Sequence, residues 1–208
     1  MGGDCLNYGC VPSKALLAAA KVAHTQNTAQ HFGLEAHIKA DFAKVMAHVK
    51  DVIAQIEPHD SPERFTELGC TVVQEYAQFR DAHTLTTPSG KQFTARRIVI
   101  ATGSRPAVPK INGLDDVPYL TNETIFDMQE QPKHLAIIGA GPIGVEMAQA
   151  FARLGTKVSV FNHGSTILGK DDAELAALLQ TQLENEGVMF HLASTLEKVE
   201  KTGRTLNI

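Results

Sequence analysis

The stretch Ile137-Ile138-Gly139-Ala140-Gly141-Pro142-Ile143-Gly144 places three glycines at G-x-G-x-x-G spacing after a short aliphatic run. In a strand–turn–helix unit each glycine has its own task. Gly139 permits the tight turn out of the strand, Gly141 lets the backbone approach a pyrophosphate, and Gly144 lets the helix pack close to the sheet. The helix N-terminus also offers unpaired N–H groups to phosphates. The stretch therefore predicts a dinucleotide-binding turn, against the alternative of a glycine turn in some other α/β unit.

The residues around this stretch alternate between strand-like and helix-like patterns. This alternation predicts a parallel sheet with helices packed on it. On the second helix, we expect an apolar stripe of Leu175, Leu178, Leu179 and Leu183. The end of the chain resembles a β-hairpin that turns about residues 202–203. The expected strands are 135–138, 157–161 and 188–191, and the expected helices are 142–154 and 171–186.

The position that selects the nicotinamide cofactor lies about 20 residues after the glycines, at the end of the second strand. Asn162 occupies it, where Asp or Glu is usual. Asn can hydrogen-bond a ribose hydroxyl and does not repel a 2′-phosphate. The neighbouring residue is His163, and no arginine stands beside it to bind that phosphate. The choice between NADH and NADPH is therefore open, and Asn162 serves equally well as a turn residue.

The first half of the chain contains two helical patterns, at residues 12–24 and 41–56, and the second is ended by Pro58 and Pro62. Strand patterns follow at 71–73 and 84–87, with a turn signal at 88–90. Residues 97–101 are typical of a short buried strand that stops at Gly103. Residues 105–113 contain two prolines and a glycine and predict an extended linker.

The segment GGDCLNYGCVPSK, residues 2–14, holds two of the three cysteines. Cys5 and Cys10 are too far apart for a disulfide on a regular helix, because the helix rises about 1.5 Å per residue. They need an irregular turn, for which Gly9 supplies the freedom. Pro12 suits the first turn of a helix, so we expect Cys10 at a helix N-terminus, where the dipole and Lys14 favour the thiolate.

Two other uses of these cysteines were weighed. A zinc site needs four ligands, usually in closely spaced pairs, and Cys70, His24 and His31 do not form a second pair. We therefore expect no metal site. Inert, buried thiols do not suit a glycine-rich loop that opens on a helix, whereas Cys70 fits a small core residue.

Composition excludes several classes of protein. The formal charge of the 208 residues is 19 − 23 = −4, which argues against a nucleic-acid or anionic-membrane binder. No apolar run approaches the ~18 residues that cross a bilayer, and no signal-peptide pattern is present. We expect a cytoplasmic protein with no nucleic-acid or membrane partner.

Residues 2–14 resemble the redox-active disulfide segment of the pyridine nucleotide–disulfide oxidoreductases, the family of dihydrolipoamide dehydrogenase, glutathione reductase and mercuric reductase. Residues 98–106 resemble the family's second flavin-contacting strand and turn, and residues 139–146 resemble its nicotinamide-cofactor fingerprint. The motifs follow in the family's order and the resemblance covers the whole chain. It is strongest to members like mercuric reductase and dihydrolipoamide dehydrogenase.

The resemblance implies a role for each matching residue. Cys5 matches the cysteine that exchanges with substrate, and Cys10 the cysteine that faces the flavin. Lys14 matches the lysine near the flavin ring, and Glu146 the acid that pairs with it across the domain boundary. Cys5, Cys10, Lys14 and Glu146 are thus the candidate catalytic residues. The candidate cofactor-binding residues are Lys14, Ala77, Thr102, Gly103, Gly139, Gly141, Pro142, Ile143, Gly144, Asn162 and Leu196.

The resemblance also implies an activity. Electrons would pass from NAD(P)H through FAD to the Cys5–Cys10 disulfide, and then to a small-molecule disulfide or a metal ion. The cofactors would be FAD and NAD(P)H, and the full-length family is homodimeric. The alternatives are a truncated, noncatalytic NAD(P)-binding module and a dithiol redox protein that acts without flavin.

The resemblance further implies an α/β fold with two Rossmann-like nucleotide-binding domains, both incomplete. Residues 1–130 would be part of an FAD-binding domain with the redox-active disulfide, and residues 131–208 part of an NAD(P)-binding domain. The family's first FAD-binding βαβ unit would precede this chain, and its C-terminal dimerisation domain would follow it.

On this basis we expect the isolated chain to bind FAD weakly or not at all, and to complete no full turnover, because the resemblance implies a first FAD-binding unit and a C-terminal domain outside these residues. Absorbance in the flavin region after purification measures this directly. A yellow protein with stoichiometric flavin would contradict the expectation.

Overall fold

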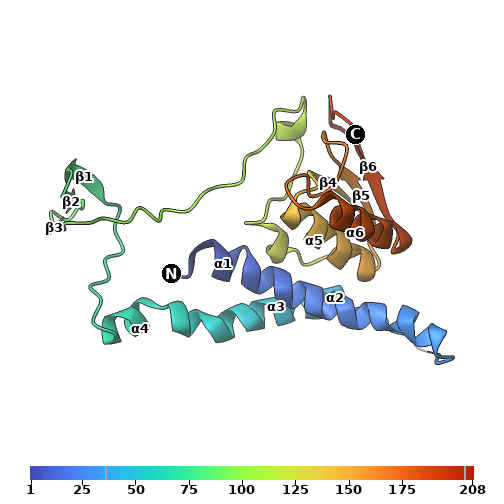
Figure 1. Ribbon diagram of the computed structural model, residues 1–208, viewed down its shortest axis with the longest axis horizontal. Helices are drawn as coiled ribbons and strands as arrows, with labels where there is room; N and C mark the ends of the chain where they lie inside the picture. The colour runs from blue at the N-terminus through green and yellow to red at the C-terminus, as the bar shows by residue number, and fades with distance from the viewer. Residues whose placement is uncertain (36, 204) are drawn as a thin grey trace.

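The computed structural model describes residues 1–35, 37–203 and 205–208 of an α/β protein. Figure 1 shows a long helical hairpin, a helix-covered parallel sheet beside it, and a small β-sheet held away from both by extended chain. None of the described helices is long and apolar enough to cross a membrane.

The parallel sheet is built as the sequence predicts. Strands β4 (His134–Ile138), β5 (Lys157–Phe161) and β6 (Val188–His191) pair in that order, all parallel. Helix α5 (Pro142–Arg153) joins the first two strands and α6 (Ala173–Asn185) the last two. Two right-handed crossovers in the same direction place both helices on one face of the sheet, as Figure 1 shows. The sheet therefore presents the carboxyl ends of β4 and β5, and the turn between β4 and α5, on one edge.

The helical hairpin packs against this unit through α5. Helix α2 (Cys10–His31) lies beside α3 (Phe42–Ile56) and also beside α5. Leu16 and Ala20 on α2 are fully buried, as are Ala148 and Phe151 on α5. The small alanines let the helices approach closely, and one continuous hydrophobic core therefore spans the hairpin and the parallel sheet.

Side-chain caps fix several helix starts. Asp41 Oδ1 accepts a hydrogen bond from the Lys44 N–H at the start of α3. Pro58 and Pro62 end α3 as expected, but the chain stays helical in η1 (Glu57–Asp60) and α4 (Pro62–Glu67). Proline is tolerated in the first turn of a helix, where its missing N–H has no partner to lose.

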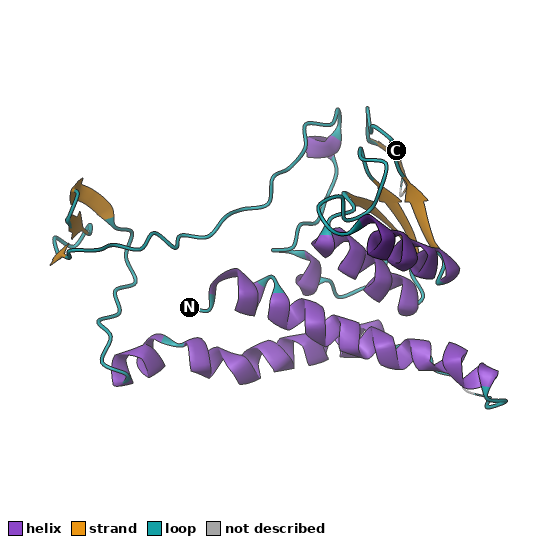
Figure 2. Ribbon diagram, in the orientation of Figure 1, coloured by secondary structure: helices purple, strands orange, loops and turns teal. Residues whose placement is uncertain are grey.

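The small sheet is antiparallel, with exposed outer strands and a half-buried central strand. Its strands are β1 (Gln78–Asp81), β2 (Thr84–Thr86) and β3 (Gln92–Thr94). Figure 2 shows that the segments leading to and from it are loops. Later in the chain come two short 3₁₀ turns, η2 (Leu114–Asp116) and η3 (Ile125–Asp127), and the predicted terminal hairpin of β7 (Glu200–Thr202) and β8 (Thr205–Asn207).

Two predicted strands are wrong. Residues 71–73 and 97–101 have no strand structure, and Val99 and Ile100 are 87% and 71% exposed instead of buried. A strand forms only where a neighbouring strand accepts its backbone hydrogen bonds. No described segment of the chain lies beside either stretch as a strand, so their aliphatic composition alone does not make them fold.

The helix predicted at 12–24 begins at Cys10 and continues to His31, two turns further than its apolar pattern. The leucine stripe of α6 is also only half right. Leu183 is buried and Leu179 packs against the core, whereas Leu175 and Leu178 are about two-thirds exposed. The face of α6 that packs against the core instead contains Ala176, Leu179 and Leu183. These residues are three and then four positions apart, so they lie on the same side of the helix.

A buried ion cluster joins three helices. Glu186, which caps α6, accepts two hydrogen bonds of 2.7 Å from Arg153 at the end of α5. Gln182 Nε2 donates to the same carboxylate at 2.9 Å, and His24 Nε2 of α2 lies 3.9 Å from it. The Glu186 side chain is only 3% exposed. Burial is the largest single effect and raises the pKa of Glu186, but Arg153, Gln182 and His24 together outweigh it and hold this pKa below its ordinary value.

We expect Glu186→Gln to lower the free energy of unfolding by about 3 kcal/mol, because it leaves Arg153 without its counter-charge. Urea unfolding at neutral pH measures this. A carboxylate whose pKa is lowered by folding stabilises the folded protein fully when the pH is above its ordinary pKa. This stabilisation is lost as the pH falls through the lowered pKa of the folded state. The wild type should therefore lose this advantage over Glu186→Gln below about pH 4.

Glu184→Gln is the matched control, since Glu184 is an exposed acid in the last turn of α6 whose hydrogen bond comes from Gln180. It should cost less than about 0.5 kcal/mol. Equal losses in the two variants would contradict the importance of the buried cluster.

Candidate functional site

The two cysteines lie on either side of a sharp break between helices. Cys5 is inside the short helix α1 (Gly3–Asn7), and Cys10 is the first residue of α2. The irregular turn expected between them is formed by Tyr8 and Gly9. A Cβ atom on Gly9 would lie 2.9 Å from the backbone oxygen of Asp4. Only glycine therefore fits where the turn passes back over the first helix.

Both cysteines are exposed, free thiols at this turn. A hydrogen bond to the Cys10 side chain is the main cause that raises the pKa of the Cys5 thiol. Burial and the neighbouring Cys10 charge act in the same direction. Cys5 therefore keeps its proton to higher pH than a free cysteine, and a base must remove that proton before Cys5 can act as a nucleophile.

Lys14 and Glu146 are 132 positions apart in sequence and are in contact in the fold. Lys14 Nζ donates to Glu146 Oε1 at 2.6 Å, so the contact predicted between the two motifs is present. Lys14 lies one turn after Cys10, and Glu146 lies just past the glycine turn on α5. The Lys14 side chain is 61% exposed, so solvent screens the ion pair. The pair therefore adds little to the free energy of unfolding, and its main effect is to fix the position of the Lys14 side chain.

Asn122 is a residue at this site that the sequence did not indicate. Its Nδ2 donates to the backbone oxygen of Tyr8 at 3.4 Å. Asn122 belongs to the linker between η2 and η3, so this bond ties the linker to the turn between the cysteines. A pair 114 residues apart with no shared motif leaves no signal that a single sequence could reveal.

The glycine turn has the geometry that its spacing predicts. Gly139 adopts φ of +105° and its N–H donates to the Phe161 oxygen at 2.8 Å. A Cβ on Gly144 would lie 2.2 Å from the Gly139 oxygen, so the start of α5 packs directly on the turn. A Cβ on Gly141 would meet nothing within 4 Å. The turn thus has one closed side, against the sheet, and one open side at Gly141, which fits a pyrophosphate.

Pro142 and Ile143 lie at the open start of α5, where both are exposed. Gly141 precedes them as the N-cap and has no side chain to satisfy the first N–H groups of the helix. The positive end of the helix dipole is therefore available to an anion.

Asn162 is placed as a structural residue of the turn. Its Oδ1 accepts from the Ala140 N–H at 3.3 Å. Its Nδ2 donates to the backbone oxygens of Gly164, at 3.1 Å, and Thr166, at 2.9 Å. Both amide hydrogens are thereby used, so of the two uses left open by the sequence, the geometry favours the turn residue over a ribose ligand.

The expected flavin contacts are not gathered at the cysteines. Ala77, Thr102 and Gly103 are exposed and lie in the extended segments on either side of the small sheet. Within the described residues, no hydrogen bond joins them to residues 2–14. Leu196 is half-buried, in the irregular chain between β6 and β7.

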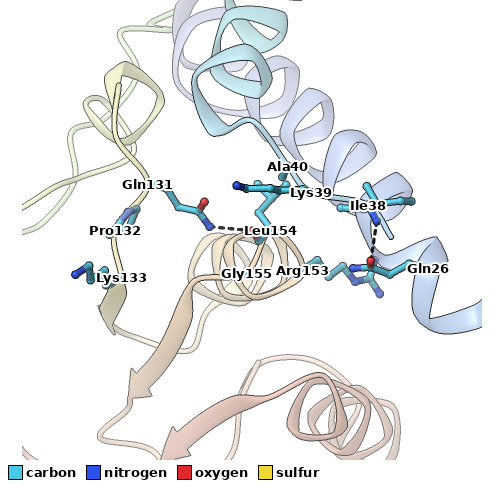
Figure 3. A pocket seen from close by; sticks show the side chains of 11 residues that line it. Gln26, Ile38, Lys39, Ala40, Gln131, Pro132, Lys133, Arg153, Leu154 and Gly155 are labelled. Atoms are coloured by element: carbon cyan, nitrogen blue, oxygen red, sulfur yellow. Dashed lines mark hydrogen bonds between the residues drawn. The ribbon is translucent and has the colours of Figure 1, made fainter. Parts of the chain in front are cut away.

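One described hollow lies away from the predicted site. A cavity of about 390 Å³ lies at the C-terminal end of α5, the end opposite to the glycine turn. Figure 3 shows Gln131 from the linker and Lys39 from the chain before α3 at this cavity. Gln131 Nε2 donates to the Leu154 oxygen at 2.8 Å and so closes the end of α5. Among the described residues, no group of acidic, histidine and cysteine side chains could hold a metal ion.

The sequence profile of a family described as pyridine nucleotide-disulphide oxidoreductase matches residues 1–207. A mercuric reductase of Streptomyces lividans is 36% identical over 208 residues, which are 97% of this chain and 44% of that protein. A dihydrolipoyl dehydrogenase of Bacillus subtilis is 32% identical over 211 residues, which are 99% of this chain and 46% of that protein.

Among solved structures, the Cu(II) complex of the HOCl-induced flavoprotein disulfide reductase RclA from Escherichia coli superposes with a TM-score of 0.81 at 26% identity. The match covers 99% of this chain and 44% of that one. The chain thus spans less than half the length of these relatives.

Substitution of Gly144 and of Gly141 should have different effects, the first on the stability of the fold and the second on the binding of a dinucleotide. We expect Gly144→Ala to lower the free energy of unfolding by about 2 kcal/mol, since its methyl group collides with the Gly139 oxygen. We expect Gly141→Ala to fold normally, because its φ of −77° suits any residue and its Cβ meets open space, yet to bind dinucleotide more weakly. Urea unfolding and NADH fluorescence titration measure the two effects. Equal stability of both variants would contradict the close packing of α5 on the turn.

Proposed function

The chain belongs to the pyridine nucleotide-disulphide oxidoreductase family, and we propose that it is the dithiol- and nucleotide-bearing part of an NAD(P)H-dependent flavoprotein reductase. The electron acceptor would be a small disulfide or a soft metal ion. The observation that carries this proposal is the 2.6 Å contact between Lys14 and Glu146. It joins the helix that begins at Cys10 to the helix that begins at the glycine turn through one side-chain contact, which supports a shared site for the two motifs.

The family uses FAD and NAD(P)H. When bound, FAD would supply the redox chemistry that links the nicotinamide to the cysteine pair, and residues of this chain would bind and orient the two cofactors. The open side of the glycine turn at Gly141 suits the nicotinamide dinucleotide. The resemblance assigns the flavin contacts to Lys14, Ala77, Thr102 and Gly103, of which only Lys14 lies beside the cysteine turn in this structure.

The chain's own chemistry is thiol–disulfide exchange. Two electrons and two protons convert the Cys5–Cys10 disulfide into two thiols. Cys5, once deprotonated, attacks a substrate disulfide and releases one substrate thiol, which takes up a proton. Cys10 then attacks Cys5 in the mixed disulfide, releases the second thiol and restores the internal disulfide.

The positions of the two cysteines support this division of labour. The hydrogen bond with Cys10 retains the proton of Cys5, while Cys10 stands at the N-terminus of α2 one turn from Lys14. A sulfur that gains negative charge at Cys10 is therefore next to a helix dipole and close to an ammonium group. Lys14 is held there by Glu146, which makes Glu146 a positioning residue in this proposal.

The substrate proposal rests on the relatives. They are named mercuric reductase, dihydrolipoyl dehydrogenase and flavoprotein disulfide reductase. A vicinal pair of thiols serves all of them, since it either exchanges with a disulfide or chelates a thiophilic ion. The homodimer that the resemblance implies and the cytoplasmic location expected from the sequence are part of the same proposal.

The cysteine pair can be tested in this chain directly. Mild oxidation should yield an internal Cys5–Cys10 disulfide by peptide mass mapping, in the wild type and in the control Cys70→Ser. In the reduced protein, Cys10→Ala should lower the pKa of Cys5 toward its ordinary value, because the hydrogen bond from Cys5 is lost. The rate of iodoacetamide labelling of Cys5 against pH measures this shift.

Two results would count against the proposal. One is oxidation that pairs either cysteine with Cys70 in place of its partner. The other is a Cys5 labelling profile that is the same with and without Cys10.

A further inference from the structure

An acid near Cys5 has no part in the proposed function so far. Helix α1, which contains Cys5, is anchored by the buried side chain of Leu6 and is in contact with α3. Figure 1 shows α1 beside the part of α3 that leads to α4. The 3₁₀ turn η1 continues α3 directly, with no loop between them, and Asp60 is its last residue. The fold therefore brings Asp60 to the same side of the hairpin as the cysteine turn.

The backbone on either side of Asp60 is fixed. Pro58 and Pro62 restrict the dihedral angles of the chain around it. Ser61 caps α4, since its Oγ accepts a hydrogen bond of 3.1 Å from the Arg64 N–H. Asp60 is half-buried, and its carboxylate has no hydrogen bond or ion pair within the described part of the chain. Its charge is therefore not neutralised by a partner and acts on the groups around it.

The Asp60 charge acts on the Cys5 sulfur. The hydrogen bond with Cys10 is the main cause that raises the pKa of the Cys5 thiol, and burial, the Cys10 charge and the Asp60 carboxylate add to it. A carboxylate that repels a neighbouring thiolate also repels any other anion that approaches the same sulfur. The cation of this region, Lys14, has its charge offset by Glu146 at 2.6 Å. Asp60 therefore makes the approach to Cys5 less favourable for anions.

The charge of the electron acceptor consequently affects the rate of exchange. Exchange begins when the Cys5 thiolate attacks one sulfur of an acceptor disulfide. The bond between the two acceptor sulfurs breaks, a mixed disulfide with Cys5 forms, and the leaving thiolate takes up a proton from the solvent. Because the acceptor sulfur must reach bonding distance of Cys5, the charges of a small acceptor come within range of the Asp60 carboxylate. Anionic disulfides should react more slowly, and cationic disulfides faster.

We propose that Asp60 is a specificity-determining residue for the cysteine pair, and that it favours cationic and uncharged acceptors over anionic disulfides. The inference rests on the proposed function, since it requires that Cys5 is the sulfur that attacks the acceptor. Cys5 forms the bond, and Asp60 acts on the acceptor only through its charge. A soft metal cation belongs to the favoured class.

The test compares small disulfides of similar size and different charge. Cystamine carries two positive charges, bis(2-hydroxyethyl) disulfide carries none, and 3,3′-dithiodipropionate carries two negative charges. The reduced chain contains Cys10→Ser and Cys70→Ser, so that the mixed disulfide at Cys5 accumulates and its rate of formation is followed by mass spectrometry. All three reagents react with the same thiolate. A change in the pKa of Cys5 therefore alters all three rates by one factor and leaves their ratios unchanged.

Asp60→Asn should lower the ratio of the cystamine rate to the dithiodipropionate rate about fivefold at an ionic strength of about 0.01 M, because it removes one charge near the reacting sulfur. Asp60→Glu keeps the charge and should keep this ratio within about twofold. With Asp60 in place, salt at about 1 M should also lower the ratio, because it screens the same charge.

Asp115→Asn is the matched control. Asp115 is an exposed acid in η2, so this substitution changes the net charge by the same amount at a distant position. It should leave the ratio of the two rates unaltered. The rate with bis(2-hydroxyethyl) disulfide reports in each variant whether Cys5 is still folded into a reactive position.

The outcomes separate the two proposals. If Asp60→Asn and Asp115→Asn give the same ratio, the inference is overturned and the proposed function stands. The same holds if Asp60→Asn changes all three rates by one common factor, since Asp60 would then act on the thiol alone. If Cys5 exchanges with none of the three disulfides, the proposed function fails and the inference fails with it.

Discussion

The packing of α2 against α5 is the contact on which the rest of the structure depends. The two helices share one hydrophobic core, with fully buried Leu16 and Ala20 facing the side of Ala148 and Phe151. An ion pair stands near each end of this contact: Lys14 with Glu146 near both N-termini, and Arg153 with Glu186, close to His24, further along. Because cores are close-packed, a shift of α2 against α5 would disturb the contacts that reach α2, which are Lys14 with Glu146 and His24 with Glu186. The cysteine turn and the glycine turn are therefore held in one fixed relation.

The two ion pairs have different effects because one is buried and the other is largely exposed. Glu186 is almost fully buried, so its bonds to Arg153 and Gln182 are needed to offset the desolvation of its charge. Lys14 and Glu146 are much more exposed, so their contact adds little free energy. Its consequence is the position of the Lys14 ammonium group, one helical turn after Cys10. The ion pair that stabilises the fold and the ion pair that lies near the cysteine turn are thus at opposite ends of the contact between α2 and α5.

Local patterns were good predictors wherever a segment could satisfy its own backbone or pair with a close neighbour. The β4–α5–β5 unit and the fingerprint glycines are as expected, since Gly139 and Gly144 answer constraints a few residues away. The strand predicted at 97–101 failed because pairing depends on a neighbour that its own residues do not specify. The leucine stripe of α6 failed in part for a similar reason, since several helical faces were apolar and only the packed sheet selects one.

The sequence by itself determined the motifs: the cysteine pair before a helix, the glycine turn, and the expectation that Lys14 meets Glu146. Each of these follows from residue types at short spacing, or from a resemblance carried by such spacing. Only the tertiary structure decided the roles of Asn162, Asn122 and Glu186, because each depends on partners that are brought close by folding. An amide or a carboxylate looks the same in sequence whether it is free to bind a ligand or already bonded to the backbone. The structure distinguishes the two, and at the end of β5 it shows both amide hydrogens of Asn162 bonded to backbone oxygens.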